Sequence, residues 1–425
     1  MADASELRTP IAIVGAGQAA ARAAQALRAL GHAGAITMVG DEPHRPYERP
    51  PLSKAVLQAD DAPATPVLPD AAFDDSRIDW LAGTRVQRLD PAARRLHLAD
   101  GRTLHYERCL LATGGTARTL PALPPGAPRT HYLRTLDDAR RLRASLRPGA
   151  RLAVIGAGFL GLEAALSARR SGVEVTLVES APLLLGRFVP AALSDWLARM
   201  VAGQGIALHL GQGLAAARAD ADAVHLRFAD GAELAADAVL VAIGLVPAVD
   251  LARDAGLAID ADDGGIAVGP GGQTSDAAVF AAGDCASQFR TTLGRRARIE
   301  SWHNANEQAA AAASGLLGLA PPAPAYPWFW TDPGEHNVQM LGLPAADLQY
   351  VCRGDPDAAG RALWLGLRDG VPVHGVALNT GGDLRALRPL FEQRVAIAPE
   401  AFAAEATALR PWVKARLAAA AAVAP

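Results

Sequence analysis

IAIVGAGQAAARAAQALRAL, residues 11–30, is the stretch that decides the fold. It opens with four apolar residues, the pattern of a strand buried on both faces of a parallel sheet. Gly15-Ala16-Gly17 and an alanine-rich helical pattern follow. Gly15 permits a tight turn, Gly17 lets the backbone approach a pyrophosphate, and Ala20 lets the helix pack closely on the strand, while the free N–H groups of the helix N-terminus would face the phosphates.

A second predicted strand makes this match more specific, because a lone glycine loop is often only a strand-to-helix turn. Residues 36–39, ITMV, follow at the right distance and end in Gly40-Asp41-Glu42, where a ribose-binding carboxylate belongs. We therefore predict that the N-terminal unit binds an adenine dinucleotide.

The same unit recurs about 140 residues later. Residues 151–163, RLAVIGAGFLGLE, read as a strand, a Gly-x-Gly-x-x-Gly loop and a helix. A further strand at 173–178 ends in Glu179. Counted from Gly156, this is close to the ~20-residue spacing expected for a ribose-binding carboxylate. Two such units, each with its carboxylate, are far more specific than one, so we predict a second dinucleotide site.

Length and composition bound the remaining possibilities. With 425 residues the chain is too long for one ordinary core, so two or three domains are expected. A net charge of −3 gives no reason to expect nucleic acid or a membrane surface, and no apolar run approaches the ~20 residues that span a bilayer. The N-terminal segment MADASELRTP is polar and acidic, unlike a signal peptide, so we expect a cytoplasmic protein.

The cysteines and histidines predict neither a redox disulfide nor a metal site. Cys109, Cys285 and Cys352 are scattered, without the spacing of a redox pair or an iron–sulfur cluster, and are expected to be small buried apolar residues. The ten histidines show no metal-ligand spacing.

Further candidate site residues lie in glycine turns and a proline-rich loop. Residues 45–54, RPYERPPLSK, present Arg49 and Lys54 in a stiff frame, which is either a solvated connector or, as we favour, a ligand-facing loop. Predicted strands at 108–112, 238–244 and 276–286 end in glycine turns that contain Thr113, Gly114, Gly244, Gly283 and Asp284. A helix N-cap is the alternative role for Asp284.

The last hundred residues have a different sequence pattern. Strand-like alternation at 348–353, 362–368 and 371–378 is followed by helical stretches near 382–394 and 399–422. We expect a separate α+β domain there.

Taken together, the motifs resemble those of the FAD-dependent, NADH-using ferredoxin reductases, such as the reductase components of bacterial aromatic-ring dioxygenases and of the camphor monooxygenase system. The resemblance covers essentially the whole chain, and YERPPLSK and PWFW separate this family from its relatives. Besides the first glycine loop, the matching motifs are YERPPLSK (47–54), LATGG (111–115), YLRTLDDA (132–139), GxGxxGxE (156–163), AAGDCA (281–286), RIESW (298–302), PWFW (327–330) and LRALRPL (384–390).

The resemblance implies a glutathione-reductase-like α/β fold, with two Rossmann-type dinucleotide-binding domains plus an α+β C-terminal domain. The implied division is an FAD-binding domain at 1–118 and 248–323, an NAD-binding domain at 119–247 and a C-terminal interface domain at 324–425.

The resemblance also implies site residues. It places the first glycines, Asp41 or Glu42, and several later residues against FAD, Glu163 and Glu179 at NADH, and Trp330 beside the isoalloxazine ring. The candidate catalytic residues are Lys54, Glu163 and Trp330. The candidate cofactor-binding residues are Gly15, Ala16, Gly17, Ala20, Asp41, Glu42, Arg49, Lys54, Val86, Thr113, Gly114, Arg134, Gly156, Gly158, Phe159, Leu160, Gly161, Glu179, Gly244, Gly283, Asp284 and Trp302.

Lys54 and Glu163 are hypothesised to form an ion pair beside the flavin N5 edge. Lys54 would supply positive charge where the reduced flavin gathers negative charge. The alternative is a surface lysine and an ordinary helix glutamate.

The implied activity is hydride transfer from NADH to FAD, followed by single-electron transfer to a separate, acidic 2Fe–2S ferredoxin that feeds an oxygenase. We expect the ferredoxin to dock near Trp330 and the arginines 290, 295, 296 and 298, because opposite charge speeds encounter. A solvated surface loop is the alternative for these arginines. The oligomeric state stays open.

Two departures from the family pattern concern the docking side. The family usually reads Trp-Ser-Asp-Gln, whereas this chain has Trp330-Thr-Asp-Pro333, followed by Gly-Glu-His336.

A rubredoxin reductase and a redox-sensing or apoptosis-type flavoprotein of the same fold remain alternatives. A disulfide or peroxide reductase would need a cysteine in residues 41–60, which contain none.

Overall fold

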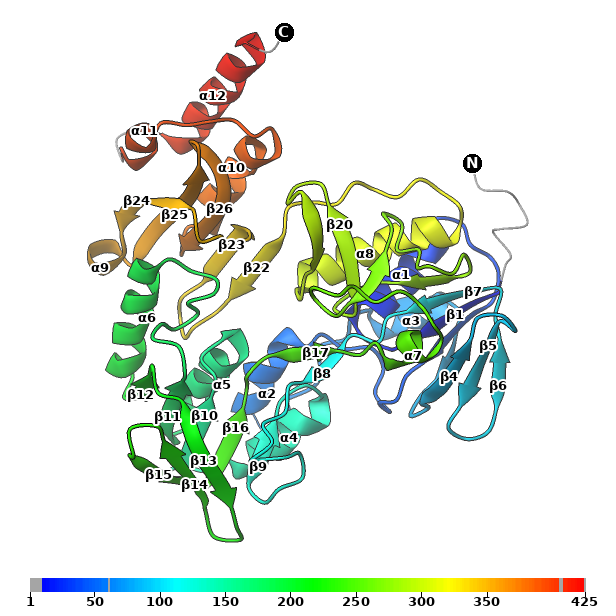
Figure 1. The fold of residues 1–425 in the computed structure, drawn as a ribbon, viewed down its shortest axis with the longest axis horizontal. Helices are drawn as coiled ribbons and strands as arrows, with labels where there is room; N and C mark the ends of the chain where they lie inside the picture. Colours follow the sequence, from blue (N-terminus) through cyan, green and yellow to red (C-terminus); the bar gives the residue numbers. More distant parts are fainter. Residues whose placement is uncertain (1–9, 60–61, 405–407, 424–425) are drawn as a thin grey trace. The chain divides into compact units, whose positions relative to one another are not determined.

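A computed structural model describes residues 10–59, 62–404 and 408–423. The chain forms two compact units, each made of segments that are distant in the sequence (Figure 1). The first unit comprises residues 1–51, 63–116 and 245–325, and the second comprises 52–62, 117–244 and 326–425. Residues 1–9, on which the expectation about the N-terminal segment depends, lie outside the described residues.

The first unit is built on a five-stranded parallel sheet in the order β19-β7-β1-β2-β3. Strands β1 (Ile11–Val14) and β2 (Ile36–Val39) are fully buried, as their continuous apolar runs predict. The other strands are β3 (Ile78–Leu81), β7 (Arg108–Leu111) and β19 (Val279–Ala281).

Successive residues of these strands enter two different hydrophobic clusters, because side chains alternate across a sheet. Ile11 and Ile13 pack with the helices α1 (Gln18–Ala29) and α8 (Trp302–Leu316), which lie side by side (Figure 1). Ala12 and Val14 pack with the smaller sheets. Alanines line the α1–α8 contact and let the two helices approach closely.

Two three-stranded sheets and several short elements complete the first unit. The antiparallel sheet β4-β5-β6 consists of Val86–Asp90, Arg95–Leu98 and Thr103–His105, and the sheet β18-β20-β21 of Ile266–Val268, Ala286–Arg290 and Arg295–Arg298. The short elements are α3 (Asp70–Asp75), α7 (Asp250–Asp254), the 3₁₀ turn η2 (Pro50–Ser53), and the paired strands β8 (Gly115–Ala117) and β17 (Leu245–Pro247).

The second unit repeats the strand, glycine loop and helix of the first. Its five-stranded parallel sheet has the order β12-β11-β10-β16-β9, and its central strand β10 leads through a glycine loop into helix α5 (Phe159–Arg170), as β1 leads into α1. The repeated glycine motif therefore marks a repeated architecture. The elements of this part are β9 (Thr130–Tyr132), β10 (Arg151–Ile155), β11 (Glu174–Glu179), β12 (Ala207–Leu210), β13 (Leu214–Ala219), β14 (Val224–Phe228), β15 (Glu233–Ala236), β16 (Ala238–Val241), α2 (Ala55–Gln58), α4 (Leu136–Ser145) and α6 (Ala191–Gly203).

Residues 326–425 contribute an antiparallel sheet in the order β22-β23-β26-β25-β24. Helices α10 and α12 pack against it through a shared apolar cluster. The elements are β22 (Trp328–Thr331), β23 (Val338–Gly342), β24 (Gln349–Asp355), α9 (Pro356–Ala359), β25 (Arg361–Arg368), β26 (Val371–Leu378), α10 (Gly381–Glu392), α11 (Pro399–Ala403) and α12 (Leu409–Val423).

The predicted α/β class and the α+β character of the C-terminal part are confirmed, whereas the three-domain division stays a prediction. The single helical stretch expected at 399–422 is wrong, because α11 and α12 are separate helices. Pro411 explains the break: proline is disfavoured inside a helix but tolerated in the first turn, where α12 places it.

Candidate functional site

Two glycine loops share one geometry at the ends of β1 and β10. Gly15 has φ 109° and Gly156 has φ 104°, a left-handed conformation that favours glycine. A Cβ at Gly15 would lie 2.2 Å from the carbonyl oxygen of Ala112, and one at Gly156 would lie 2.4 Å from that of Ala242. Each turn therefore packs directly on the end of a neighbouring strand.

The second glycine of each loop faces open space. A Cβ at Gly17 or Gly158 would meet no other heavy atom of the described chain within 4 Å. These two glycines are the N-caps of α1 and α5, which have no side-chain cap and no acidic residue in the first turn. Backbone N–H groups at such helix ends bind phosphate well, so both loops fit the pyrophosphate of a dinucleotide.

Small residues lie where helix and strand pack closely, at Ala20, as predicted, and at Gly161. Ala20 is fully buried in α1. A Cβ at Gly161 would lie 1.9 Å from the carbonyl oxygen of Gly156, so the third glycine of the second loop has no room for a side chain. Phe159 and Leu160, predicted to contact a cofactor, are partly exposed at the start of α5.

Two predicted turns gather around the first glycine loop. A Cβ at Gly15 would lie 3.3 Å from the amide of Thr113, and one at Gly283 would lie 3.1 Å from Ala19 Cβ in the first turn of α1. Asp284 follows Gly283 in a turn before β20, so the helix N-cap alternative is wrong. The carboxyl ends of β1, β7 and β19 thus meet at one edge, where ligands of parallel sheets bind.

Glu42 is the better fixed of the two predicted ribose carboxylates. Its Oε1 accepts a hydrogen bond from Arg49 at 2.8 Å, and its Oε2 accepts one from the Tyr47 hydroxyl at 2.5 Å. The pKa of Arg49 is raised: burial opposes the charge, but Tyr47, Glu42 and Asp284 outweigh burial. Asp41 is exposed. Tyr47 is a member of this cluster that sequence reasoning missed.

The remaining predicted FAD contacts are dispersed. Val86 has its side chain in the hydrophobic core of the first unit. Trp302 is the first residue of α8 in that unit, whereas Arg134 belongs to the second unit, just before the capping box of α4. Gly244, with φ 112°, ends the second unit's 117–244 segment. Their contacts with a cofactor stay predictions.

Glu179, at the end of β11, is linked to the second glycine loop by a hydrogen bond. Its Oε2 accepts a hydrogen bond from the backbone N–H of Ala157 at 2.9 Å. Its Oε1 accepts one from the backbone N–H of Ala181 at 2.9 Å and one from the Ser180 hydroxyl at 3.1 Å. The carboxylate is thus held at the end of β11, next to the loop, which is the position expected for ribose recognition.

The ion pair predicted between Lys54 and Glu163 is present in the second unit. Lys54 Nζ lies 3.2 Å from Glu163 Oε1. Lys54 is the N-cap residue of α2, and Glu163 lies in α5 with its side chain only 8% exposed. A carboxylate buried to this degree needs several hydrogen-bond donors.

Three further donors satisfy Glu163. The Ser53 hydroxyl donates to Oε2 at 2.6 Å, the Thr331 hydroxyl donates to Oε1 at 2.7 Å, and the backbone N–H of Asp332 donates to Oε1 at 3.2 Å. Thr331 replaces the serine that the family usually has, and it keeps the hydroxyl donor. The departure at this position therefore keeps a group that can donate to Glu163.

Asp332 gives Lys54 a second carboxylate partner. Lys54 Nζ lies 2.6 Å from Asp332 Oδ2, closer than Glu163. Ser53, Thr331 and Asp332 were not predicted as site residues. Ser53 and Thr331 lie beside the predicted residues Lys54 and Trp330 in the sequence, but no local pattern reveals the contacts with α5.

Trp330 and Trp328 have different surroundings in β22. Trp328 packs against the core of the C-terminal domain, while Trp330 is partly exposed. The unusual His336 lies edge-on to the Trp196 ring of α6, with ring centroids 4.9 Å apart. The changed loop is thus packed against the same unit.

The arginines predicted to form a docking cluster do not act as one surface patch. Arg290 is 1% exposed and ion-pairs with Glu307 at 2.5 Å, so the prediction is wrong for this residue. The segment is a β20–β21 hairpin, in which alternate side chains point to opposite faces. Arg296 and Arg298 donate to backbone carbonyls of the same unit, while Arg295 is exposed.

The described cysteines and polar side chains supply no redox or metal centre. Burial raises the pKa of the Cys109 and Cys285 thiols, which makes them inert. The expectation of burial is wrong for Cys352, which is exposed on β24. Among residues 10–59, 62–404 and 408–423, no cluster of three metal-ligating side chains occurs. No helix in the same ranges combines the length and the apolar character that a membrane crossing requires.

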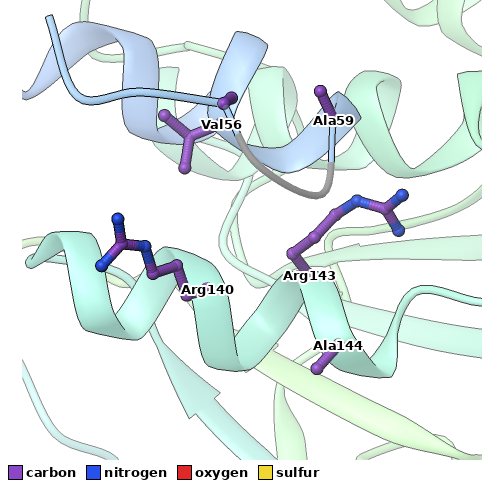
Figure 2. A pocket seen from close by; sticks show the side chains of 6 residues that line it. Val56, Ala59, Arg140, Arg143 and Ala144 are labelled. Carbon is purple, nitrogen blue, oxygen red and sulfur yellow. The ribbon is translucent and has the colours of Figure 1, made fainter.

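A small cavity of about 130 Å³ lies between α2 and α4 (Figure 2). Val56 and Ala59 line it on one side, and Arg140 and Arg143 line it on the other. Arg140 pairs with Asp137 at 3.7 Å, and Arg143 donates to the carbonyl of Leu146. Both guanidinium groups therefore have protein partners, and none of the predicted site residues lines this cavity.

Comparison with known proteins gives matches along nearly the whole chain. Residues 9–309 match the model of the pyridine nucleotide-disulphide oxidoreductases, and residues 328–413 match that of the reductase C-terminal domain. The ferredoxin–NAD(+) reductase component of an anthranilate 1,2-dioxygenase system from Burkholderia cepacia is 42% identical over 384 residues, 90% of this chain and 94% of that protein.

Two other relatives agree. The ferredoxin reductase component of a chlorobenzene dioxygenase from Cupriavidus sp. (strain PS12) is 40% identical, covering 96% of this chain and 99% of that protein. Putidaredoxin reductase, solved in a covalent complex with putidaredoxin, matches with a TM-score of 0.90 and 34% identity over 97% of this chain and 99% of that one.

Proposed function

This chain belongs to the pyridine nucleotide-disulphide oxidoreductase family, and we propose that its two glycine loops bind the two cofactors and that the cluster around Lys54 takes part in the reaction. The protein is an NADH-dependent ferredoxin reductase that uses FAD. It passes electrons to a 2Fe–2S ferredoxin that serves an oxygenase.

The first unit would hold FAD. The open face of Gly17 and the uncapped start of α1 fit its pyrophosphate, and Glu42, fixed by Arg49 and Tyr47, fits the ribose hydroxyls. Bound FAD supplies the chemistry that the side chains lack, since it accepts a hydride and releases electrons singly. The protein's task is to hold and orient it.

The second unit would hold NADH. Gly158 and the start of α5 repeat the phosphate-binding geometry, and Glu179 presents a fixed carboxylate beside them. A family name that refers to disulfides does not describe this chain's chemistry, because Cys109 and Cys285 are buried and residues 41–60 contain no cysteine.

The surroundings of Lys54 support our proposal that this residue acts at the reacting centre. It is a partly buried ammonium held between two carboxylates that come from α5 and from the end of β22. An ammonium fixed in this way offers a directed N–H donor to an atom on which negative charge develops during a reaction. Glu163 would orient it, because four donors keep that carboxylate in place.

Lys54→Met tests this role, with Lys414→Met as the matched control because Lys414 is the other lysine of the chain and is exposed in α12. We expect Lys54→Met to retain FAD but to be reduced by NADH roughly a hundredfold more slowly, the usual effect of losing one preorganised charge. Lys414→Met should react at the wild-type rate. Wild-type reduction of Lys54→Met with full FAD content would refute the role.

We also propose a cytoplasmic location, since NADH is supplied there. No feature of the described residues favours a rubredoxin over a ferredoxin as the electron acceptor, or a redox-sensing role over turnover.

A further inference from the structure

The ammonium of Lys54 is shared by two carboxylates, and the cluster carries one net negative charge. Lys54 Nζ lies 2.6 Å from Asp332 Oδ2 and 3.2 Å from Glu163 Oε1. One positive charge cannot neutralise both acids. The excess charge lies in a partly buried place, where it is weakly screened.

Glu163 does not depend on Lys54 alone. Ser53, Thr331 and the backbone N–H of Asp332 already donate to it, so its carboxylate would keep three donors if Lys54 moved. Asp332 differs, because its side chain is 38% exposed and is held by hydrogen bonds from Lys54 and Asn337.

The position of Asp332 is nevertheless well defined. Asn337 Nδ2 donates to Asp332 Oδ1 at 2.7 Å, and the backbone N–H of Asn337 donates to Asn379 Oδ1 at 2.8 Å. Asp332 is therefore tied to β26 through Asn379 as well as to Lys54. A carboxylate held this way offers a fixed charge, which a freely rotating surface side chain does not.

A fixed net negative charge distinguishes the two forms of the nucleotide. The nicotinamide ring is neutral in NADH and carries a positive charge in NAD⁺. A negative cluster lowers the free energy of the cationic ring and leaves that of the neutral ring nearly unchanged. Glu163 lies in α5, the helix that starts at the second glycine loop, so the cluster belongs to the nucleotide-binding unit.

We propose that Asp332 is a specificity-determining residue, whose charge tightens binding of the cationic nicotinamide ring and whose contact with Lys54 keeps that ammonium between the two carboxylates. The inference rests on the proposed function, because it takes the second glycine loop as the nucleotide site. It adds a residue of the C-terminal domain to that site.

The test is equilibrium binding to the oxidised, FAD-loaded protein. Asp332→Asn removes the charge and keeps the oxygen that accepts from Asn337. ADP-ribose serves as the reference ligand, because it has both phosphates and both riboses but no nicotinamide. Asp347→Asn is the matched control, an exposed acid of the same domain that pairs with Arg368 at 2.6 Å.

We expect Asp332→Asn to bind NAD⁺ roughly tenfold more weakly, the effect of removing one nearby charge at a partly exposed site. ADP-ribose should bind as it does to wild type, Asp332→Glu should recover part of the NAD⁺ affinity, and Asp347→Asn should change neither ligand. Unchanged NAD⁺ affinity in Asp332→Asn would overturn the inference. An equal loss for NAD⁺ and ADP-ribose would also overturn it, because Asp332 would then only support the fold.

Failure here is distinguishable from failure of the proposed function. A variant that binds NAD⁺ normally and still passes electrons from NADH to ferredoxin removes the role of Asp332 alone. A wild-type protein that binds neither NAD⁺ nor ADP-ribose removes the nucleotide site itself.

Discussion

The hydroxyl of Thr331 donates a 2.7 Å hydrogen bond to Glu163 Oε1. The two residues are 168 positions apart in the sequence. The bond joins the end of β22, one residue after Trp330, to the helix of the second glycine loop. Thr331 is fully buried, so no water replaces the bond if the hydroxyl is lost. The strand that carries Trp330 is therefore fixed to the carboxylate that orients Lys54.

Thr331→Val tests this bond, with Thr331→Ser as its control. Valine keeps the shape but removes the donor, and we expect a loss of about 1–3 kcal/mol in the free energy of unfolding together with slower flavin reduction by NADH. Serine loses one buried methyl group, about 1 kcal/mol, but should keep the wild-type reduction rate. Equal reduction rates in the two variants would show that the hydroxyl does not position Glu163.

Glu179 predicts a preference for NADH over NADPH. Its carboxylate is held beside the second glycine loop, where a 2′-phosphate would meet it with like charge. Glu179→Gln removes that repulsion, and we expect the ratio of kcat/KM for NADPH to that for NADH to rise about tenfold. A ratio that does not change would mean that specificity is set elsewhere.

His374 makes the stability of the C-terminal domain dependent on pH. It is 1% exposed in β26, and burial lowers its pKa from 6.5 to about 4. Its Nδ1 lies 2.7 Å from the Tyr350 hydroxyl. Below pH 6.5 the unfolded chain binds a proton that the folded chain resists, so stability is lost as the pH falls from about 6.5 to about 4.

The loss from His374 should be about 3 kcal/mol over that interval. Denaturant unfolding of wild type and His374→Gln at several pH values measures it, since glutamine does not titrate. The difference in unfolding free energy between the two proteins should change by this amount across the interval. Parallel pH profiles would show that His374 does not titrate as its burial requires.

Arg295 is the arginine of the β20–β21 hairpin to test for ferredoxin docking. It is exposed, whereas Arg290, its partner across the hairpin, is buried. Arg295→Glu should slow association with an acidic ferredoxin at low salt and leave stability within about 0.5 kcal/mol. Arg290→Glu should unfold the protein, because Arg290 is buried against Glu307. Unaltered ferredoxin reduction by Arg295→Glu would move the docking site elsewhere.

The parts of the fold that were predictable from sequence are those with a strong local pattern. The apolar run, Gly15 and the alanine helix specify a strand, a turn and a helix within 20 residues, and the same holds at Gly156. Lys54 and Glu163 were paired through the family resemblance, and the structure contains that ion pair.

The rest of the site is formed by contacts that no local pattern encodes. Ser53 meets Glu163 across 110 positions and Lys54 meets Asp332 across 278, so neither pairing has a signature of spacing or periodicity. Arg290 was expected on the docking surface because opposite charge speeds the encounter with an acidic ferredoxin. Its burial depends on Glu307 of α8, which is visible only in the fold.

Anaerobic rapid mixing of the FAD-loaded protein with NADH and an oxidised 2Fe–2S ferredoxin tests the central claim most directly. The flavin absorbance should bleach on adding NADH and return as the ferredoxin cluster is reduced, with two ferredoxin molecules reduced for each NADH consumed. A protein that holds no FAD, or a flavin that NADH reduces but that passes no electrons to any 2Fe–2S ferredoxin while reducing a rubredoxin, would contradict it.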